Sequence, residues 1–98
     1  PGAGFVQGVP RLGIPNLTET DGPHGVGWAL GQRDDYATAM PSGISLGATF
    51  NRELAYDYGV VIGAEARAKG FNVLLAGGAN LARDPRNGRT FEYISEDP

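Results

Sequence analysis

Apolar residues recur along residues 52–69 with the spacing of a single helix face. The stripe that they form consists of Leu54, Ala55, Tyr58, Val61, Ile62 and Ala66. Asn51 stands before it as a candidate N-cap, Glu53 lies in the first turn, and Gly70 follows at a position typical of a left-handed helix end. The pattern predicts an amphipathic helix over residues 52–69, with its apolar face packed against the rest of the fold.

Two shorter runs flank this helix and predict strands. Residues 71–76 are apolar on both faces except for Asn72, which is typical of a parallel strand covered on both sides. Residues 14–20 form a second strand candidate, which ends at the DGP turn of residues 21–23. The order strand, long loop, helix, strand makes a βαβ unit, and hence an α/β fold with a parallel sheet. Because two strands and one helix cannot cover such a sheet, most of it is expected outside this chain.

The remaining segments carry weaker patterns. Residues 1–13 are rich in glycine and are interpreted as a connecting loop. Residues 22–43 are interpreted as a long loop, and loops of that length in compact domains are usually functional. In residues 44–49, apolar side chains alternate with serine, glycine and threonine, which predicts a half-buried extended segment.

The bulk properties argue against several classes of partner. A formal net charge of −3 and an isoelectric point near 4.9 disfavour nucleic acid or an anionic membrane as the main partner. The chain has no cysteine, so it offers neither a disulfide nor a thiolate metal site. No apolar run approaches the roughly 18 residues of a membrane span. The chain opens on Pro1 and stops at Pro98 within a charged stretch, so we expect a segment of a longer protein.

Charged side chains concentrate in residues 83–98, which contain three arginines and four carboxylates. Such a segment is expected on the surface, because each buried charge would lose its hydration. It follows a strand candidate after six residues, so it is interpreted as a polar loop at the carboxyl end of that strand, where α/β folds place their ligand sites. The turn that begins at Asp21 ends the other strand candidate in the same way.

Asp21 and Arg89 are the candidate ligand-binding residues. A carboxylate accepts hydrogen bonds from paired hydroxyls and a guanidinium donates to their oxygens, so the two groups at neighbouring strand ends suit a polyhydroxylated ligand. The alternatives are structural. Asp21 could form an Asx-turn, and Arg89 could form an ion pair with Glu92 or Asp97.

Residues 43–47 match G-x-S-x-G, the nucleophile elbow of α/β-hydrolases, around Ser45. The elbow needs a strand before the serine, a helix directly after it and a histidine later in the chain, whereas the one histidine, His24, lies upstream. A serine hydrolase is therefore the weaker alternative. His24 alone cannot hold a metal ion, so it either bonds a ligand hydroxyl or supports its loop. No metal ion and no cofactor are expected.

Three stretches of the chain together resemble a known family. They are VPRLGIPNLTETDGPHGV at residues 9–26, ATAMPSGISLGATFNRELA at residues 37–55, and residues 62–98, which end in GRTFEYISEDP. In order and spacing they resemble the amino-terminal part of glycoside hydrolase family 3, the β-glucosidase and β-xylosidase family. The GR-x-FE-x-x-SEDP block is the most specific of the three. The resemblance implies that residues 1–98 are part of a TIM-type (β/α)8 barrel, with the rest of the barrel and a following domain outside this chain.

The resemblance also implies an activity. It points to a retaining β-glycosidase, most simply a β-glucosidase, acting on a small β-glycoside or oligosaccharide. The family's nucleophilic aspartate and acid/base glutamate are expected beyond residue 98, so this segment alone should be inactive. By the same resemblance, Asp21 and Arg89 hold hydroxyls of the terminal sugar, and Glu92, Asp97 and His24 support the loops.

Several alternatives remain open within the family. A β-xylosidase, another β-glycosidase or a non-catalytic sugar-binding relative would share these motifs. An N-acetylglucosaminidase ranks lower, because that branch has a different D-x-E-G-G-R turn. Gly27, followed by Trp28, stands where many members have arginine, which leaves the preference for the leaving group open.

Overall fold

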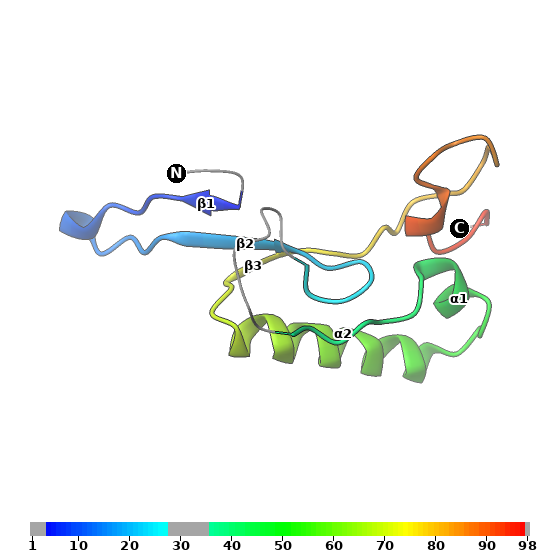
Figure 1. The fold of residues 1–98 in the computed structure, drawn as a ribbon, viewed down its shortest axis with the longest axis horizontal. Coiled ribbons are helices and arrows are strands. Elements are labelled where there is room, and N and C mark those ends of the chain that lie inside the picture. Colours follow the sequence, from blue (N-terminus) through cyan, green and yellow to red (C-terminus); the bar gives the residue numbers. More distant parts are fainter. Residues whose placement is uncertain (1–3, 28–35, 98) are drawn as a thin grey trace.

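The computed structural model describes residues 4–27 and 36–97 (Figure 1). In chain order, the elements are β1 (Phe5–Val6), the 3-10 helix η1 (Pro10–Leu12), β2 (Leu17–Asp21), α1 (Gly43–Gly47), α2 (Arg52–Ala68), β3 (Val73–Leu75) and the 3-10 helix η2 (Thr90–Glu92). The helix α2 lies along one side of the strands, and α1 lies close to η2 beyond their carboxyl ends (Figure 1). No helix in the described ranges has the length and apolar character needed to cross a membrane.

The sheet has the strand order β1-β2-β3. β2 and β3 are parallel, with Glu19 opposite Val73 and Asp21 opposite Leu75, while β1 pairs antiparallel with β2. The long loop and α2 therefore make the crossover between two parallel strands, which confirms the βαβ unit and the α/β class. Both parallel strands end at the same edge of the sheet, so Asp21 and the chain after Leu75 begin side by side.

The helix α2 forms where the pattern predicted it. Asn51 is its N-cap, with its side-chain oxygen accepting from the Leu54 amide at 3.1 Å. Glu53 lies in the first turn and Arg67 in the last, each at the end where the helix dipole favours its charge. Gly70 follows in the left-handed region with φ of 86°, so the helix ends there as expected.

Asn72, the polar interruption of the third strand, links that strand to β2. Its side-chain oxygen accepts from the Thr18 amide and its side-chain nitrogen donates to the Asn16 carbonyl, both at 2.8 Å. Its own backbone amide donates to the Thr18 carbonyl at 3.1 Å. The Asn72 side chain thus extends the pairing of the two strands ahead of β3 and holds them in one register.

Two predicted segments differ from the structure. Residues 1–13 are not simply a connecting loop: where they are described, they contain β1 and η1. Both residues of β1 are exposed, so the strand has no alternation of buried and exposed positions by which the sequence could reveal it. The extended segment predicted over residues 44–49 is wrong, because α1 is a short helix there, capped by Ser42. A single helical turn is too short for its apolar residues to show a 3.6-residue period.

The core of the described residues is small. Three hydrophobic residues are buried, Val26, Ile62 and Ala66. Leu54 and Val61, which belong to the apolar stripe of α2, remain 45% and 43% exposed. The radius of gyration is 15.3 Å, against about 13 Å for a compact domain of about 100 residues. The apolar faces of α2 and of the sheet are therefore only partly covered by these residues.

Because so little apolar surface is buried, we expect the isolated 98-residue chain to lack a cooperative fold. Its circular dichroism signal should change gradually on heating, and it should bind the dye ANS at room temperature. The full-length protein, measured in the same buffer, is the control and should bind little dye. A sharp unfolding transition of the isolated chain, with no dye binding, would contradict this expectation.

Candidate functional site

A hollow of about 630 Å³ opens at the carboxyl ends of β2 and β3. Its lining comes from three segments: the end of β2 with its turn, the end of β3 with the residues that follow, and the loop that carries η2. The lining side chains that can bear charge are Asp21, His24, Arg89 and Glu92. The structure thus brings together the two candidate binding residues, which lie far apart in the sequence.

Asp21 is the last residue of β2 and is exposed. The backbone around it is held tightly: its carbonyl accepts from the Gly27 amide at 2.8 Å, and the Gly22 amide donates to the Leu75 carbonyl at 3.2 Å. The buried hydroxyl of Thr20 lies 2.5 Å from the Gly27 carbonyl oxygen and closes the same turn. Among the described residues, no hydrogen bond engages the Asp21 carboxylate, so the Asx-turn alternative is not formed. The carboxylate is available to a ligand.

Arg89 forms an ion pair with Glu92 and not with Asp97. Its Nε lies 2.9 Å from Glu92 Oε1 and its Nη2 lies 2.6 Å from Glu92 Oε2, a two-point contact. The Arg89 side chain is 74% exposed and that of Glu92 is 18% exposed. Two N–H groups point at Glu92, so three of the five guanidinium donors stay available. The arginine can therefore be oriented by Glu92 and still donate to a ligand.

The pKa values of this pair shift in opposite directions. The hydrogen bonds from Arg89 lower the pKa of Glu92, and the charge of Arg89 acts in the same direction, against the opposing effect of desolvation. The hydrogen bonds to Glu92 raise the pKa of Arg89, and the charge of Asp21 contributes in the same direction. The Asp21 carboxylate thus interacts electrostatically with the Arg89 guanidinium. The site presents one carboxylate bound to the arginine and one that is unbound.

His24 lines the hollow, but its Nε2 does not reach a partner there. Its ring stacks on the Phe91 ring, with 5.3 Å between the centroids and 22° between the planes. Its Nε2 is buried and has no hydrogen-bond partner. The His24 carbonyl accepts from the Met40 amide at 2.9 Å and anchors the turn. These contacts favour the supporting role over a direct bond from the imidazole to a ligand.

Two glycines let the η2 loop approach closely: Gly78, after β3, which the sequence analysis did not single out, and Gly43, the first residue of α1, which it considered only within the G-x-S-x-G match. A Cβ on Gly78 would overlap the Glu92 carbonyl oxygen, and one on Gly43 would lie 3.1 Å from the same atom. Only a residue without a side chain permits this approach. The Gly77-Gly78 pair directly after a predicted strand was the available signal, because glycines there often mark close backbone contact.

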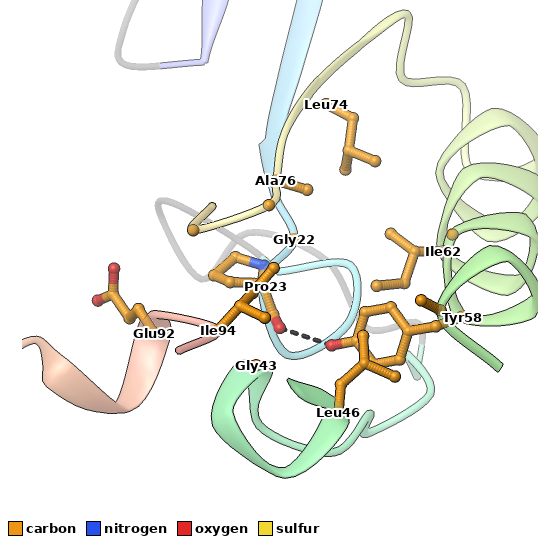
Figure 2. A pocket seen from close by; sticks show the side chains of 14 residues that line it. Gly22, Pro23, Gly43, Leu46, Tyr58, Ile62, Leu74, Ala76, Glu92 and Ile94 are labelled. Atoms are coloured by element: carbon orange, nitrogen blue, oxygen red, sulfur yellow. Dashed lines mark hydrogen bonds between the residues drawn. The ribbon is translucent and has the colours of Figure 1, made fainter. Parts of the chain in front are cut away.

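Tyr58 is a second support that sequence reasoning assigned only to the apolar stripe. Its hydroxyl lies 2.6 Å from the Pro23 carbonyl oxygen and 2.9 Å from that of Pro41, so it connects α2 to both ends of the long loop. Burial raises the pKa of Tyr58, which keeps the hydroxyl protonated as a donor. Figure 2 shows its ring beside an apolar hollow of about 330 Å³, from which the Glu92 carboxylate points away.

The other sequence-derived candidates lie elsewhere. Ser45 is the third residue of α1 and its hydroxyl lies 2.8 Å from that of Ser42, so it does not stand at a strand-to-helix turn as a nucleophile elbow requires. Asp97 is exposed, does not line the hollow, and has its backbone amide bound to the Ser95 hydroxyl at 3.0 Å. Trp28 lies outside the described residues. Within the described ranges, no cluster of three or more potential ligand residues could hold a metal ion.

The sequence model of the "Glycosyl hydrolase family 3 N terminal domain" matches residues 4–98. The chain belongs to glycosyl hydrolase family 3. Among its relatives, a probable beta-glucosidase F of Aspergillus flavus is 48% identical over 99 residues, which is 100% of this chain and 11% of the relative. A beta-glucosidase of Bacteroides ovatus is 49% identical over 100 residues, covering 93% of this chain and 13% of the relative.

Solved structures of family 3 enzymes share the fold of this segment. Beta-glucosidase 3B from Thermotoga neapolitana, in complex with glucose, aligns with a TM-score of 0.86 at 43% identity over 98% of this chain and 14% of that one. DesR, a beta-glucosidase from Streptomyces venezuelae in complex with D-glucose, aligns with a TM-score of 0.83 at 40% identity, over 96% of this chain and 12% of that one. The family 3 segment described here therefore spans about a tenth to a seventh of the length of these proteins.

The ion pair predicts a change in the pH at which the Glu92 carboxyl titrates. We expect the Glu92 carboxyl to titrate below its ordinary value of 4.5, because Arg89 stabilises the ionised form. A lowered pKa means that the pair stabilises the folded state fully above pH 4.5. This stabilisation is lost as the pH falls through the lowered pKa of Glu92. Carbon-13 NMR titration of labelled glutamates in the full-length protein measures this, with Glu92→Gln identifying the signal.

Two variants test the cause of that shift. In Arg89→Ala, the pKa of Glu92 should return towards 4.5. Arg86→Ala is the matched control, since Arg86 forms its own pair with Asp84 on the same loop at 2.8 Å. An unshifted Glu92 in the wild type, or an equal change in both variants, would contradict the assignment.

Proposed function

We propose that this chain is part of the amino-terminal (β/α)8 barrel of a retaining β-glycosidase, most simply a β-glucosidase, and that it supplies part of the subsite for the terminal sugar. The observation that carries the proposal is the meeting of Asp21 and Arg89 in one hollow. The carboxylate has no hydrogen bond among the described residues and the guanidinium keeps donors available. Family membership and the glucose-bound relatives supply the ligand class.

The barrel is the architecture that best accounts for the uncovered surfaces. A parallel βαβ unit repeated around a closed ring covers the inner face of each strand with barrel side chains and the outer face with helices. The half-exposed residues of α2 and of β3, such as Val61 and Leu75, would then be buried. Barrel enzymes place their sites at the carboxyl ends of the strands, which is where Asp21 and the loop after β3 lie.

The chemistry assigned to this segment is binding and orientation. In retaining glycosidases one carboxylate attacks the anomeric carbon and a second carboxyl protonates the leaving oxygen, at a separation of about 5 Å. We place both groups beyond residue 98, as the resemblance to the family implies, and Glu92 is already paired with Arg89. Asp21 would accept from neighbouring sugar hydroxyls while Arg89 donates to their oxygens. The sugar ring is thereby held in the orientation that the reacting carboxylates require.

Two alternatives keep the same binding site and differ in outcome. A β-xylosidase or another β-glycosidase would cleave its own substrate faster than a glucoside. A non-catalytic relative would bind glucose but cleave nothing. Initial rates of the full-length protein on 4-nitrophenyl β-glucoside and β-xyloside, combined with calorimetric titration of glucose, distinguish the three.

We expect Asp21→Ala and Arg89→Ala each to lower kcat/KM by about 100-fold or more in the full-length enzyme. Each change removes charge-assisted hydrogen bonds to the sugar of roughly 1.5–3 kcal/mol or more. Arg86→Ala is the control, because Arg86 lies on the same loop but outside the lining of the hollow. If both variants keep wild-type kinetics, the two residues have structural roles only.

A further inference from the structure

We infer that the stacked pair of His24 and Phe91 positions Arg89 and Glu92 against Asp21, so that His24 governs sugar binding without touching the sugar. The inference rests on the proposed function, because its effect is read through the sugar subsite. It assigns His24 and Phe91 as positioning residues.

Two stacked rings join the two loops of the site. Asp21 belongs to the turn after β2, and Arg89 belongs to the loop that carries η2. Among the described residues, no hydrogen bond connects residues 21–27 with residues 89–93. One direct side-chain contact between them is the stack of His24 on Phe91. Backbone packing brings the η2 loop close, and these two rings then link it directly to the turn that carries Asp21.

His24 acts through the face of its ring and not through its Nε2 nitrogen. Because its Nε2 is buried and unpartnered, that nitrogen cannot donate to a ligand in the hollow. Leaving a polar atom buried without a partner is unfavourable and is rare in folded proteins. The face of the His24 ring, in contrast, has a partner in the Phe91 ring. The centroid distance of 5.3 Å and the interplanar angle of 22° lie in the range of offset stacking. His24 thus contributes through its aromatic face.

The 3-10 helix η2 links Phe91 to the ion pair of Arg89 and Glu92. Phe91 is the middle residue of η2, with Arg89 directly before this turn and Glu92 at its end. The turn is closed by the Glu92 amide donating to the Arg89 carbonyl at 3.0 Å and the Tyr93 amide donating to the Thr90 carbonyl at 3.1 Å. Fixing the Phe91 ring fixes this turn, and the turn sets the direction of the Arg89 side chain.

The kinetic test uses the full-length enzyme. His24→Ala should lower kcat/KM for 4-nitrophenyl β-glucoside by about tenfold, an effect comparable to losing one aromatic pair. Most of the loss in kcat/KM should come from a higher KM, because misplaced donors weaken the binding of the substrate and of its transition state alike. The inhibition constant of glucose should rise by a similar factor. His24→Phe should restore both values, because it keeps a stacking ring and removes the unpartnered nitrogen. An inactive His24→Phe variant would overturn the inference.

A double-mutant cycle separates positioning from a general structural role. In the Arg89→Ala background, His24→Ala should cause little further loss of kcat/KM, because the residue through which it acts is gone. Full additivity of the two losses would overturn the inference. Phe91→Leu should behave like His24→Ala in both backgrounds, and it serves as the second route if His24→Ala does not yield folded protein.

A measurement without catalysis keeps the inference separate from the proposed function. Hydrogen exchange of the segment around residues 89–93, followed by mass spectrometry, should be faster in His24→Ala than in wild type and near wild type in His24→Phe. If the wild-type protein cleaves no glycoside but this pattern appears, the proposed function fails and the positioning role stands. If the wild type is active and exchange is the same in all three proteins, the positioning role fails.

Discussion

The parallel pairing of β2 and β3 is the interaction on which the rest of this structure depends. Parallel strands end at the same edge of a sheet, and this brings Asp21 next to the segment that leads to Arg89. Asn72 secures the pairing from the opposite end through its side-chain bonds to the backbone of β2. A shift of one residue would turn the side chains of β2 to the other face. The register held near Asn72 therefore decides where the Asp21 carboxylate lies.

The charged groups of the hollow divide into two roles. Glu92 neutralises and orients Arg89, while the Asp21 carboxylate has no hydrogen bond among the described residues. This arrangement is possible because the η2 loop lies directly on the backbone of Gly43 and Gly78, where any side chain would push it away. Close backbone packing thus sets the geometry on which the electrostatics act. On the proposed function, a polyhydroxylated ligand would meet an acceptor and a donor that are already in place.

The same residues do not supply the stability of this arrangement by themselves. Burial of apolar surface is the main favourable term in folding, at about 25 cal/mol per Å², and the described residues bury three hydrophobic side chains. On the proposed barrel, other parts of the protein would cover the exposed apolar faces of α2 and β3. The site is therefore built by this segment and, on that proposal, stabilised by its surroundings.

Local spacing was enough to predict α2, the parallel strand after it, the placement of Asp21 at the end of β2 and that of Arg89 in the loop after β3, because caps, periodicity and turn residues act over a few positions. It failed for α1, since five residues of mixed apolar and small character fit either a strand or one helical turn. There the decision comes from contact with the η2 loop, where the Gly47 backbone meets Ile94.

What the sequence by itself determined is which residues form the helix and the strands and which polar groups reach the edge of the sheet. Only the tertiary structure decided that Arg89 pairs with Glu92 and leaves Asp97 aside, and that His24 faces Phe91. Each of these choices depends on how a turn closes or on how two loops distant in sequence pack together, and no short-range pattern encodes that.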